Sequence, residues 1–189
     1  PTPGSRGRWE EIDANSNLTV DFGFIPVFSL GNRVFFDTNN NSLRNGAEGG
    51  VNNVRVRLYA SDGTTEIPVG PDGILNTADD AANGMLTAGG GYYRFNNLLA
   101  GDYIVKVAAS NFGVGQPLRS YWSSGTTING VGVISETAAA LANSDIDTDD
   151  NGTLSGGDVV ASIVTLGPTT TSEPLAEAEL SGGQGQPDG

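Results

Sequence analysis

Short runs in which apolar and polar residues alternate, separated by turn-forming residues, constrain this chain more than any other feature. Residues 18–24, 54–59 and 103–107 place apolar side chains at every second position, which is the period of a half-buried strand. Helical periodicity is nearly absent, and 28 glycines supply turns between the runs. The pattern predicts an all-β fold, a β-sandwich of short strands. Further candidate strands lie at 29–37, 92–95, 132–136 and 159–166.

The chain is strongly acidic, with 22 acidic against 9 basic residues and a net charge of −13. Nucleic acids and anionic membrane surfaces attract the opposite charge, so we expect no nucleic-acid partner. No apolar run approaches the ~20 residues that a membrane span requires, and we expect no span. The acidity has two readings, either solubility and salt adaptation or carboxylates gathered to hold cations. The positions of the acidic residues bear on this choice.

Cysteine and histidine are both absent from the chain. Disulfides, thiolate sites and imidazole sites are therefore excluded, and any metal would be held by oxygen ligands, which favours Ca²⁺ over zinc or copper. The commonest catalytic pairs of nucleophile and base also need histidine or cysteine. We therefore expect that this protein is not an enzyme.

The first acidic segment, residues 37–48, has the spacing of a calcium-binding loop. Oxygen ligands fall at positions one, three, five, seven and twelve of such a loop: Asp37, Asn39, Asn41, the Leu43 carbonyl and Glu48. Ser42 stands where the usual loop has glycine, and flanking helices are missing. We expect a calcium loop set between strands; the alternative is an asparagine-rich hairpin loop.

The last acidic segment, residues 147–158, fits the same template with glycine at position six. The candidate ligands, in loop order, are Asp147, Asp149, Asn151, the Thr153 carbonyl and Asp158. Asp145 and Asp150 are additional carboxylates, which would repel their neighbours unless a cation lay among them. The alternative is a solvated acidic loop.

The middle acidic segment, residues 70–80, fits no standard calcium loop. It still gathers Asp72, Asn76, Asp79 and Asp80 within one stretch rich in turn-forming residues. Spacing alone leaves calcium binding and a solvated turn equally open.

Several motifs occur together in the order of a known family. They are GNRVFFDTN at 31–39, the strand at 54–58, GYYRF at 91–95 and GDYIVKV at 101–107. Over residues 18–167 the chain resembles the SdrD-type B domain of bacterial serine–aspartate-repeat surface proteins, which is related to collagen-adhesin B-type domains. The resemblance implies a Greek-key sandwich, prealbumin-like or immunoglobulin-like, with long calcium-binding loops. It also implies a rigid calcium-dependent spacer or adhesive module outside the cell, and it favours calcium at 70–80.

The chain departs from this family in two respects. Some collagen-adhesin-type domains carry an internal isopeptide bond from a lysine on an early strand, whereas the only lysine here is Lys106 in a later one. We therefore expect no such bond. The second departure is one of order, because residues 15–24 resemble the strand that closes a repeat, yet they precede the opening strand. The sandwich is thus expected to lack its own last strand.

These features predict four segments along the chain. We expect a flexible N-terminal segment at 1–17, an isolated strand at 18–25, the sandwich at 26–167 and a flexible linker at 168–189. Because the sequence begins with Pro1 rather than methionine, we expect a piece of a longer exported precursor. The apolar face of the isolated strand would enter a neighbouring copy, close a preceding repeat, or fold back onto its own domain; this face comprises Leu18, Val20, Phe22 and Phe24.

The functional expectation is a non-enzymatic, calcium-stabilised structural module, a repeat of an adhesin stalk or a subunit of a bacterial surface filament. Its partners would be copies of itself arranged head to tail, or neighbouring repeats. The alternative is an adhesive module that binds carbohydrate or a host matrix protein through exposed aromatic residues. The sequence points to no particular adhesive target. The aromatic candidates are Trp9, Tyr59, Tyr121 and Trp122.

Overall fold

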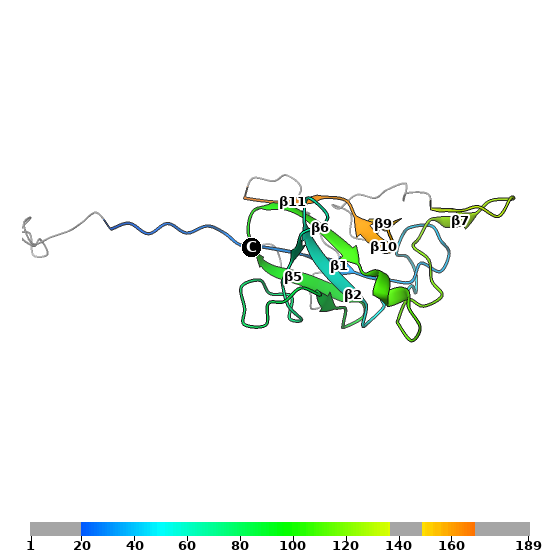
Figure 1. Ribbon diagram of the computed structural model, residues 1–189, viewed down its shortest axis with the longest axis horizontal. Helices are drawn as coiled ribbons and strands as arrows, with labels where there is room; N and C mark the ends of the chain where they lie inside the picture. The colour runs from blue at the N-terminus through cyan, green and yellow to red at the C-terminus, as the bar shows by residue number, and fades with distance from the viewer. Residues whose placement is uncertain (1–19, 137–148, 169–189) are drawn as a thin grey trace, which may run out of the picture.

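The computed structural model describes residues 20–136 and 149–168, and the regular structure in them consists of antiparallel strands joined by long loops, apart from one short helical turn (Figure 1). The helical element in these residues is a single 3-10 turn, η2 (Ala109–Phe112). Among the described residues, therefore, no helix has the length and apolar character needed to cross a membrane. Leu18, Asp145, Asp147, the segment 1–17 and nearly all of 168–189 lie outside the described residues.

The larger sheet has the strand order β3-β2-β6-β10-β9. Its members are β3 (Glu66–Ile67), β2 (Arg55–Ala60), β6 (Gly101–Val107), β10 (Asp158–Ala161) and β9 (Gly152–Ser155), with β4 (Met85–Leu86) paired to β2 and β11 (Val164–Leu166) paired to β6. The second sheet pairs β1 (Phe28–Arg33) with β5 (Tyr92–Leu98), and a separate hairpin joins β7 (Thr126–Ile128) to β8 (Ile134–Glu136). β2 pairs with β6 although β5 lies between them in sequence, the crossover expected of a Greek-key sandwich.

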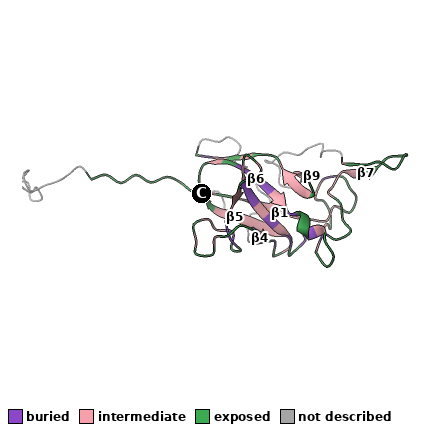
Figure 2. Cartoon of the chain, in the orientation of Figure 1, coloured by how far each residue is buried: buried purple, intermediate pink, exposed green. Residues whose placement is uncertain are grey.

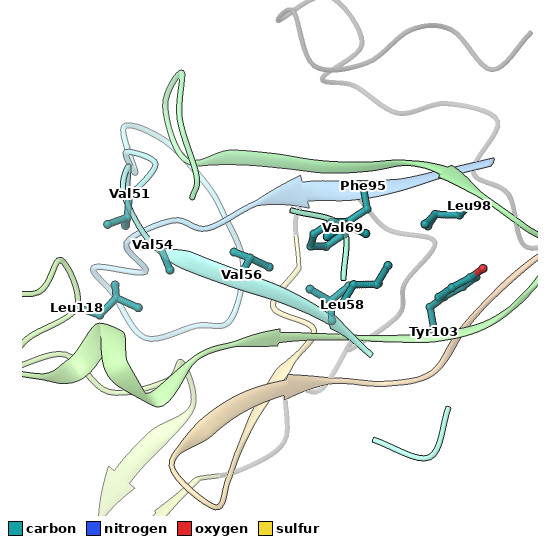
Figure 3. Packing of buried hydrophobic residues seen from close by; sticks show 10 residues of the cluster. Val51, Val54, Val56, Leu58, Val69, Phe95, Leu98, Tyr103 and Leu118 are labelled. Carbon is teal, nitrogen blue, oxygen red and sulfur yellow. The ribbon is translucent and has the colours of Figure 1, made fainter. Parts of the chain in front are cut away.

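The core lies between β2 and β6 on one side and β5 on the other. Val56 and Leu58 alternate with the arginines of β2 and are fully buried. Figure 3 shows Phe95 and Leu98 of β5 reaching toward this layer, and both side chains are also fully buried. The alternation read from the sequence therefore assigns the inner face of β2 correctly. The predicted all-β sandwich is confirmed.

The structure corrects two strand boundaries. The strand expected at 29–37 is shorter than predicted, because β1, which pairs with β5, ends at Arg33. Residues 34–36 instead bond to the far end of the acidic loop, through Phe36 N–H to the Gly49 carbonyl (2.9 Å). The loop thus returns the chain beside its own start. The strand expected at 159–166 is broken at residues 162–163 into β10 and β11, which pair with different parts of β6.

The segment ahead of β1 joins no sheet in the described part of the chain. Residues 20–27 run out from the domain as an extended strand (Figure 1), and Figure 2 colours them as exposed. Val20, Phe22 and Phe24 are 64%, 81% and 93% exposed. Three large apolar side chains in a row on one face are therefore in contact with solvent.

Candidate cation sites

The first acidic loop is organised around the Asp37 carboxylate. It accepts hydrogen bonds from the N–H groups of Asn41 (3.2 Å) and Ser42 (2.8 Å). The Asn39 side-chain oxygen also accepts from the Asn41 N–H (3.1 Å). Ser42 has a φ of +61°, the left-handed conformation that a glycine would ordinarily supply here. The chain therefore makes the sharp turn of a calcium loop without the usual glycine.

Glu48 closes the same loop. One carboxylate oxygen accepts from the Thr38 N–H (2.8 Å) and hydroxyl (2.9 Å), and the other accepts from the Asn45 N–H (2.9 Å). These bonds, led by that of Asn45, lower the pKa of Glu48 and keep it ionised. The Asn45 side chain also donates to the Leu43 carbonyl (3.2 Å) and accepts from the Asn39 amide (3.3 Å). The groups at loop positions three, seven and twelve therefore all form hydrogen bonds with Asn45.

Residues 149–151, from the other end of the chain, lie against this loop. Leu43 and Asp149 form an antiparallel bridge, and the Asp150 N–H donates to the Ser42 carbonyl at 2.9 Å. The Asn151 side chain donates to the Asp149 carboxylate (3.3 Å). The two acidic segments that match the calcium-loop template therefore meet, although more than a hundred residues separate them in the sequence.

The closing half of the predicted loop 147–158 is not formed, because residues 152–158 build a hairpin. Gly156 and Gly157 turn the chain with φ of +60° and +97°, and a Gly-Gly pair favours a two-residue hairpin. The hairpin separates Asp158 from Asn151, and the Asp158 carboxylate accepts the N–H of Ala109 (2.8 Å) instead. Thr153 lies exposed on β9. Neither residue joins Asp149, and the Gly-Gly pair was the sequence signal for this outcome.

Asp150 and Glu136 each bury a carboxylate oxygen that has no hydrogen-bond partner in the described residues. Asp150 accepts a hydrogen bond from the Gly152 N–H (3.1 Å), but its second carboxylate oxygen is buried without a hydrogen-bond partner among these residues. Burial raises the pKa of Asp150 to about 6, and the charges of Glu136, Asp37 and Asp149 act in the same direction. Glu136 accepts from a backbone N–H of β9 (2.6 Å), and its other oxygen is likewise buried and unpartnered there. Glu136 was not singled out from the sequence, since only tertiary structure brings it here.

The middle acidic segment gathers three carboxylates around one hydroxyl. The Thr77 Oγ1 lies 2.7 Å from an Asp79 oxygen, 3.2 Å from Asp80 and 3.4 Å from Asp72. A threonine hydroxyl has one proton to donate, so only one of these contacts is a hydrogen bond from Thr77 at a time. The Asn76 N–H donates to Asp80 (2.8 Å). Three of the four predicted residues therefore converge.

Acidic side chains alone do not form a metal site in the described part of the chain. Over 20–136 and 149–168, no three acidic side chains are arranged to hold a metal ion by themselves. A bound cation would therefore need amide and backbone carbonyl oxygens as well, a mixed oxygen set that Ca²⁺ accepts. The unpartnered oxygens of Asp150 and Glu136 are groups that such a cation would satisfy.

Other residues considered in the sequence lie apart from these loops. The Lys106 ammonium donates to the Gly63 carbonyl (2.7 Å) and lies over the Tyr59 ring, on the outer face of the larger sheet. Tyr121 stacks against Phe36 with ring centroids 4.6 Å apart and is 52% exposed. Its neighbour Trp122 is 61% exposed. Trp9 lies outside the described residues.

Comparison with known proteins agrees with this architecture. Residues 28–118 match the model of the SdrD B-like domain family. The "Fibrinogen-binding protein" of Staphylococcus epidermidis is 33% identical over 99 residues, which are 51% of this chain and 8% of that protein. "Serine-aspartate repeat-containing protein I" of Staphylococcus saprophyticus is 36% identical over 96 residues, 50% of this chain and 4% of that protein. The chain thus spans only a small part of the length of these relatives.

Among solved structures, GBS52, the minor pilin of Streptococcus agalactiae, superposes over 58% of this chain and 38% of its own, with 21% identity and a TM-score of 0.35. The assignment of the chain depends on the family model and the sequence relatives, which agree with the strand motifs and loops described above. Residues 28–118 of this chain are an SdrD B-like domain.

Proposed function

We propose that this chain is a calcium-stabilised, non-enzymatic structural module of a bacterial surface filament or adhesin stalk, joined head to tail by strand donation. The carrying observation is the contact between the acidic loop of the SdrD B-like domain and residues 149–151, which follow that domain, with buried carboxylate oxygens left unpartnered in the described residues. Relatives with this domain are named as repeat-containing and fibrinogen-binding proteins, and none of these names describes an enzyme. A location outside the cell or on its surface follows from the same proposal.

Calcium would be held at two places in this proposal. At the first, the loop 37–48 would supply its carboxylate, amide and carbonyl oxygens, and residues 149–151 with Glu136 would complete the site. At the second, the carboxylates around Thr77 would share an ion only together with backbone carbonyl oxygens, since no three acidic side chains of the described residues are placed to hold a metal by themselves. Bound calcium supplies positive charge that keeps buried carboxylates ionised. Because the first site joins both ends of the domain, its binding free energy would contribute directly to folding.

The link between modules would be the segment ahead of β1. Its alternate apolar side chains are exposed and its backbone pairs with no strand in the described part of the chain. An extended segment of this kind can add a strand to another sheet. Head-to-tail addition uses two different surfaces on each copy, so it grows a linear assembly rather than a closed ring.

Thermal unfolding with calcium and with excess chelator tests the metal part of the proposal. With a few millimolar Ca²⁺ we expect a higher unfolding midpoint than with chelator, and a smaller response to Mg²⁺, which demands stricter geometry. Isothermal titration would then count the ions bound. An unchanged unfolding midpoint together with no heat of binding would mean that the acidic segments are solvated turns that bind no calcium.

A second candidate is an adhesive module, favoured by the exposure of Tyr121 and Trp122 side by side. Such aromatic pairs can pack on sugars or on a partner protein. Retention on glycan or matrix-protein arrays, lost in Trp122→Ala and kept in a Val114→Ala control that is also exposed, would favour this function over a purely structural one.

A further inference from the structure

In the described residues, one side of the sandwich is not covered by a strand of the second sheet. A hollow of about 380 Å³ lies between the inner face of β6 and β10 and the segment that follows β1. The second sheet has only two strands, β1 and β5, against the larger sheet facing it, so in the described residues it does not extend over β10. The hollow is lined by both apolar and polar residues. Charged and amide side chains, among them Arg33, Arg44 and Asp150, lie along it, and its apolar side chains include Phe36, Val107, Phe112, Leu118, Val159 and Ala161.

The hollow has the position that a further strand beside β1 would take. In the described residues β1 forms a ladder with β5 and with no other strand. Residues 32–37, from the end of β1 onward, line the hollow, and so do Val107 and Val159 on the facing sheet. Val107 and Val159 are paired residues on neighbouring strands and point to the same side. A strand bound here would lie beside the backbone of β1, and its side chains would pack on Val107 and Val159.

The exposed segment 20–24 has the complementary pattern. In an extended strand, Val20, Phe22 and Phe24 project to one side, while Asp21 and Gly23 project to the other. A cavity of about 150 Å³ holds one benzene molecule, so the hollow has room for about two phenyl rings. The segment brings two phenylalanines, which are 81% and 93% exposed where they now lie.

The segment is poorly placed to fill the hollow of its own domain by a tight turn. Pro26 lies between it and β1, and proline holds φ near −65°. A two-residue hairpin through Ile25 and Pro26 would require positive φ at the first or both positions, which the β-branched Ile25 disfavours. The observed chain instead continues straight away from the domain (Figure 1).

We propose that the hollow between β1 and β6–β10 is the acceptor groove for residues 20–24 of a second copy of this chain. The apolar side chains of the incoming strand enter the hollow, and its backbone pairs with the edge of β1. This inference rests on the proposed head-to-tail linkage and assigns its receiving surface. Asp37, Asp149, Asp150 and Asn151 also line the hollow, so the groove adjoins the first candidate calcium site.

Two complementary variants test the groove directly. The double variant Phe22→Asp and Phe24→Asp retains the groove but places charges on the donor, whereas Ala161→Phe retains the donor but fills the groove. In the presence of calcium, each variant alone should be monomeric by analytical ultracentrifugation. Their mixture should form a 1:1 dimer that grows no further. We expect the donor changes to weaken association by about 100-fold or more, as for loss of an interface anchor.

Cysteine cross-linking gives a readout that does not depend on how Ala161→Phe folds, since the chain has no cysteine of its own. Phe22→Cys mixed with Val159→Cys should form a disulfide-linked heterodimer under mild oxidation. Phe22→Cys mixed with Thr64→Cys is the matched control, because Thr64 is exposed in the turn beside Lys106, on the outer face of the same sheet. The control pair should remain unlinked.

The outcomes separate this inference from the proposed function. One contrary result is that filaments form without a cross-link between positions 22 and 159, and another is that they form with equal cross-linking in the Thr64→Cys control. Either result would be compatible with strand donation but would overturn the assignment of this hollow as the acceptor groove. A wild-type chain that stays monomeric at high concentration with calcium would overturn both. An internal disulfide in monomers of the double variant Phe22→Cys and Val159→Cys would show that the segment fills its own groove, and would also overturn the proposal.

Discussion

The two sides of the sandwich differ sharply in how well their apolar faces are covered. Between β2 and β5, side chains such as Leu58 and Phe95 are fully buried. Over β6 and β10 the side chains of Val107 and Val159 are only partly buried and border the hollow. Both faces present apolar side chains, yet within the described residues no strand of the second sheet covers β10. The closed side is therefore where the isolated chain obtains its stability, and the open side is where a partner would add to it.

The largest effect should come from truncation on the closed side. Phe95→Ala is expected to lower the free energy of unfolding by about 3–5 kcal/mol, the usual cost of removing a buried phenyl ring. Val159→Ala, on the open side, should cost less than about 1.5 kcal/mol in the monomer. Urea unfolding of both variants measures the difference. Equal losses would mean that the open side is covered in solution.

A buried hydroxyl on the closed side should have the next largest effect. Thr87 is 1% exposed, and its Oγ1 donates to the Val51 carbonyl (2.6 Å) and accepts from the Val54 N–H (3.0 Å). Thr87→Val keeps the shape and leaves backbone groups without this partner, at a cost of about 1–3 kcal/mol. Thr127→Val in the exposed β7–β8 hairpin is the matched control. A similar loss in both variants would contradict the assignment.

Calcium should act at the edge of the open side. For a dissociation constant of about 10⁻⁴ to 10⁻³ M, ~10 mM Ca²⁺ would stabilise each site by about 1.4–2.7 kcal/mol. Asp150→Asn removes the charge on a buried carboxylate with an unpartnered oxygen, so it should stabilise the calcium-free protein while reducing the gain on adding calcium. Chemical unfolding of variant and wild type, each with calcium and with chelator, measures both effects. If calcium raises the free energy of unfolding of Asp150→Asn as much as that of wild type, Asp150 is not part of the calcium site.

The smallest effect concerns the turn after β2, which contributes no residue to either candidate site. The Thr65 hydroxyl and the N–H groups of Thr64 and Thr65 bond to Asp62 and lower its pKa to about 2. A lowered pKa gives stability that is present above about pH 4 and lost as the pH falls from about 4 to 2. Asp62→Asn should therefore be less stable than wild type at about pH 6, and the gap should narrow in acid.

The control for this effect is Asp21→Asn, which removes a charge from the exposed extended segment. Thermal midpoints of the three proteins between about pH 2 and 6 make the comparison. A gap between Asp62→Asn and wild type that stays constant over this whole range would contradict the role of the Asp62 carboxylate.

Much of this molecule could be predicted from local sequence. The alternation at 54–59 and 103–107 gave β2 and β6, because a side chain on a strand chooses its face by position alone. The loop at 37–48 is held by short-range hydrogen bonds from its own backbone to Asp37 and Glu48, whereas calcium binding there stays a prediction. The hairpin at 152–161 departs from the predicted calcium loop, because the Gly156–Gly157 pair favours a tight turn between two strands.

The amino-acid sequence by itself determined which segments are strands and which turns carry carboxylates, because these depend on side-chain period and on neighbours a few residues apart. Only the tertiary structure decided that Asp149 and Asp150 lie against the loop at 37–48, and that Glu136 joins them. It also decided that the second sheet, over the described residues, stops at β1 and leaves a hollow. The reason is that sheet order and contacts between loops depend on which surfaces, distant in sequence, bury each other. A local residue pattern shows that a surface is apolar but does not specify which other segment covers it.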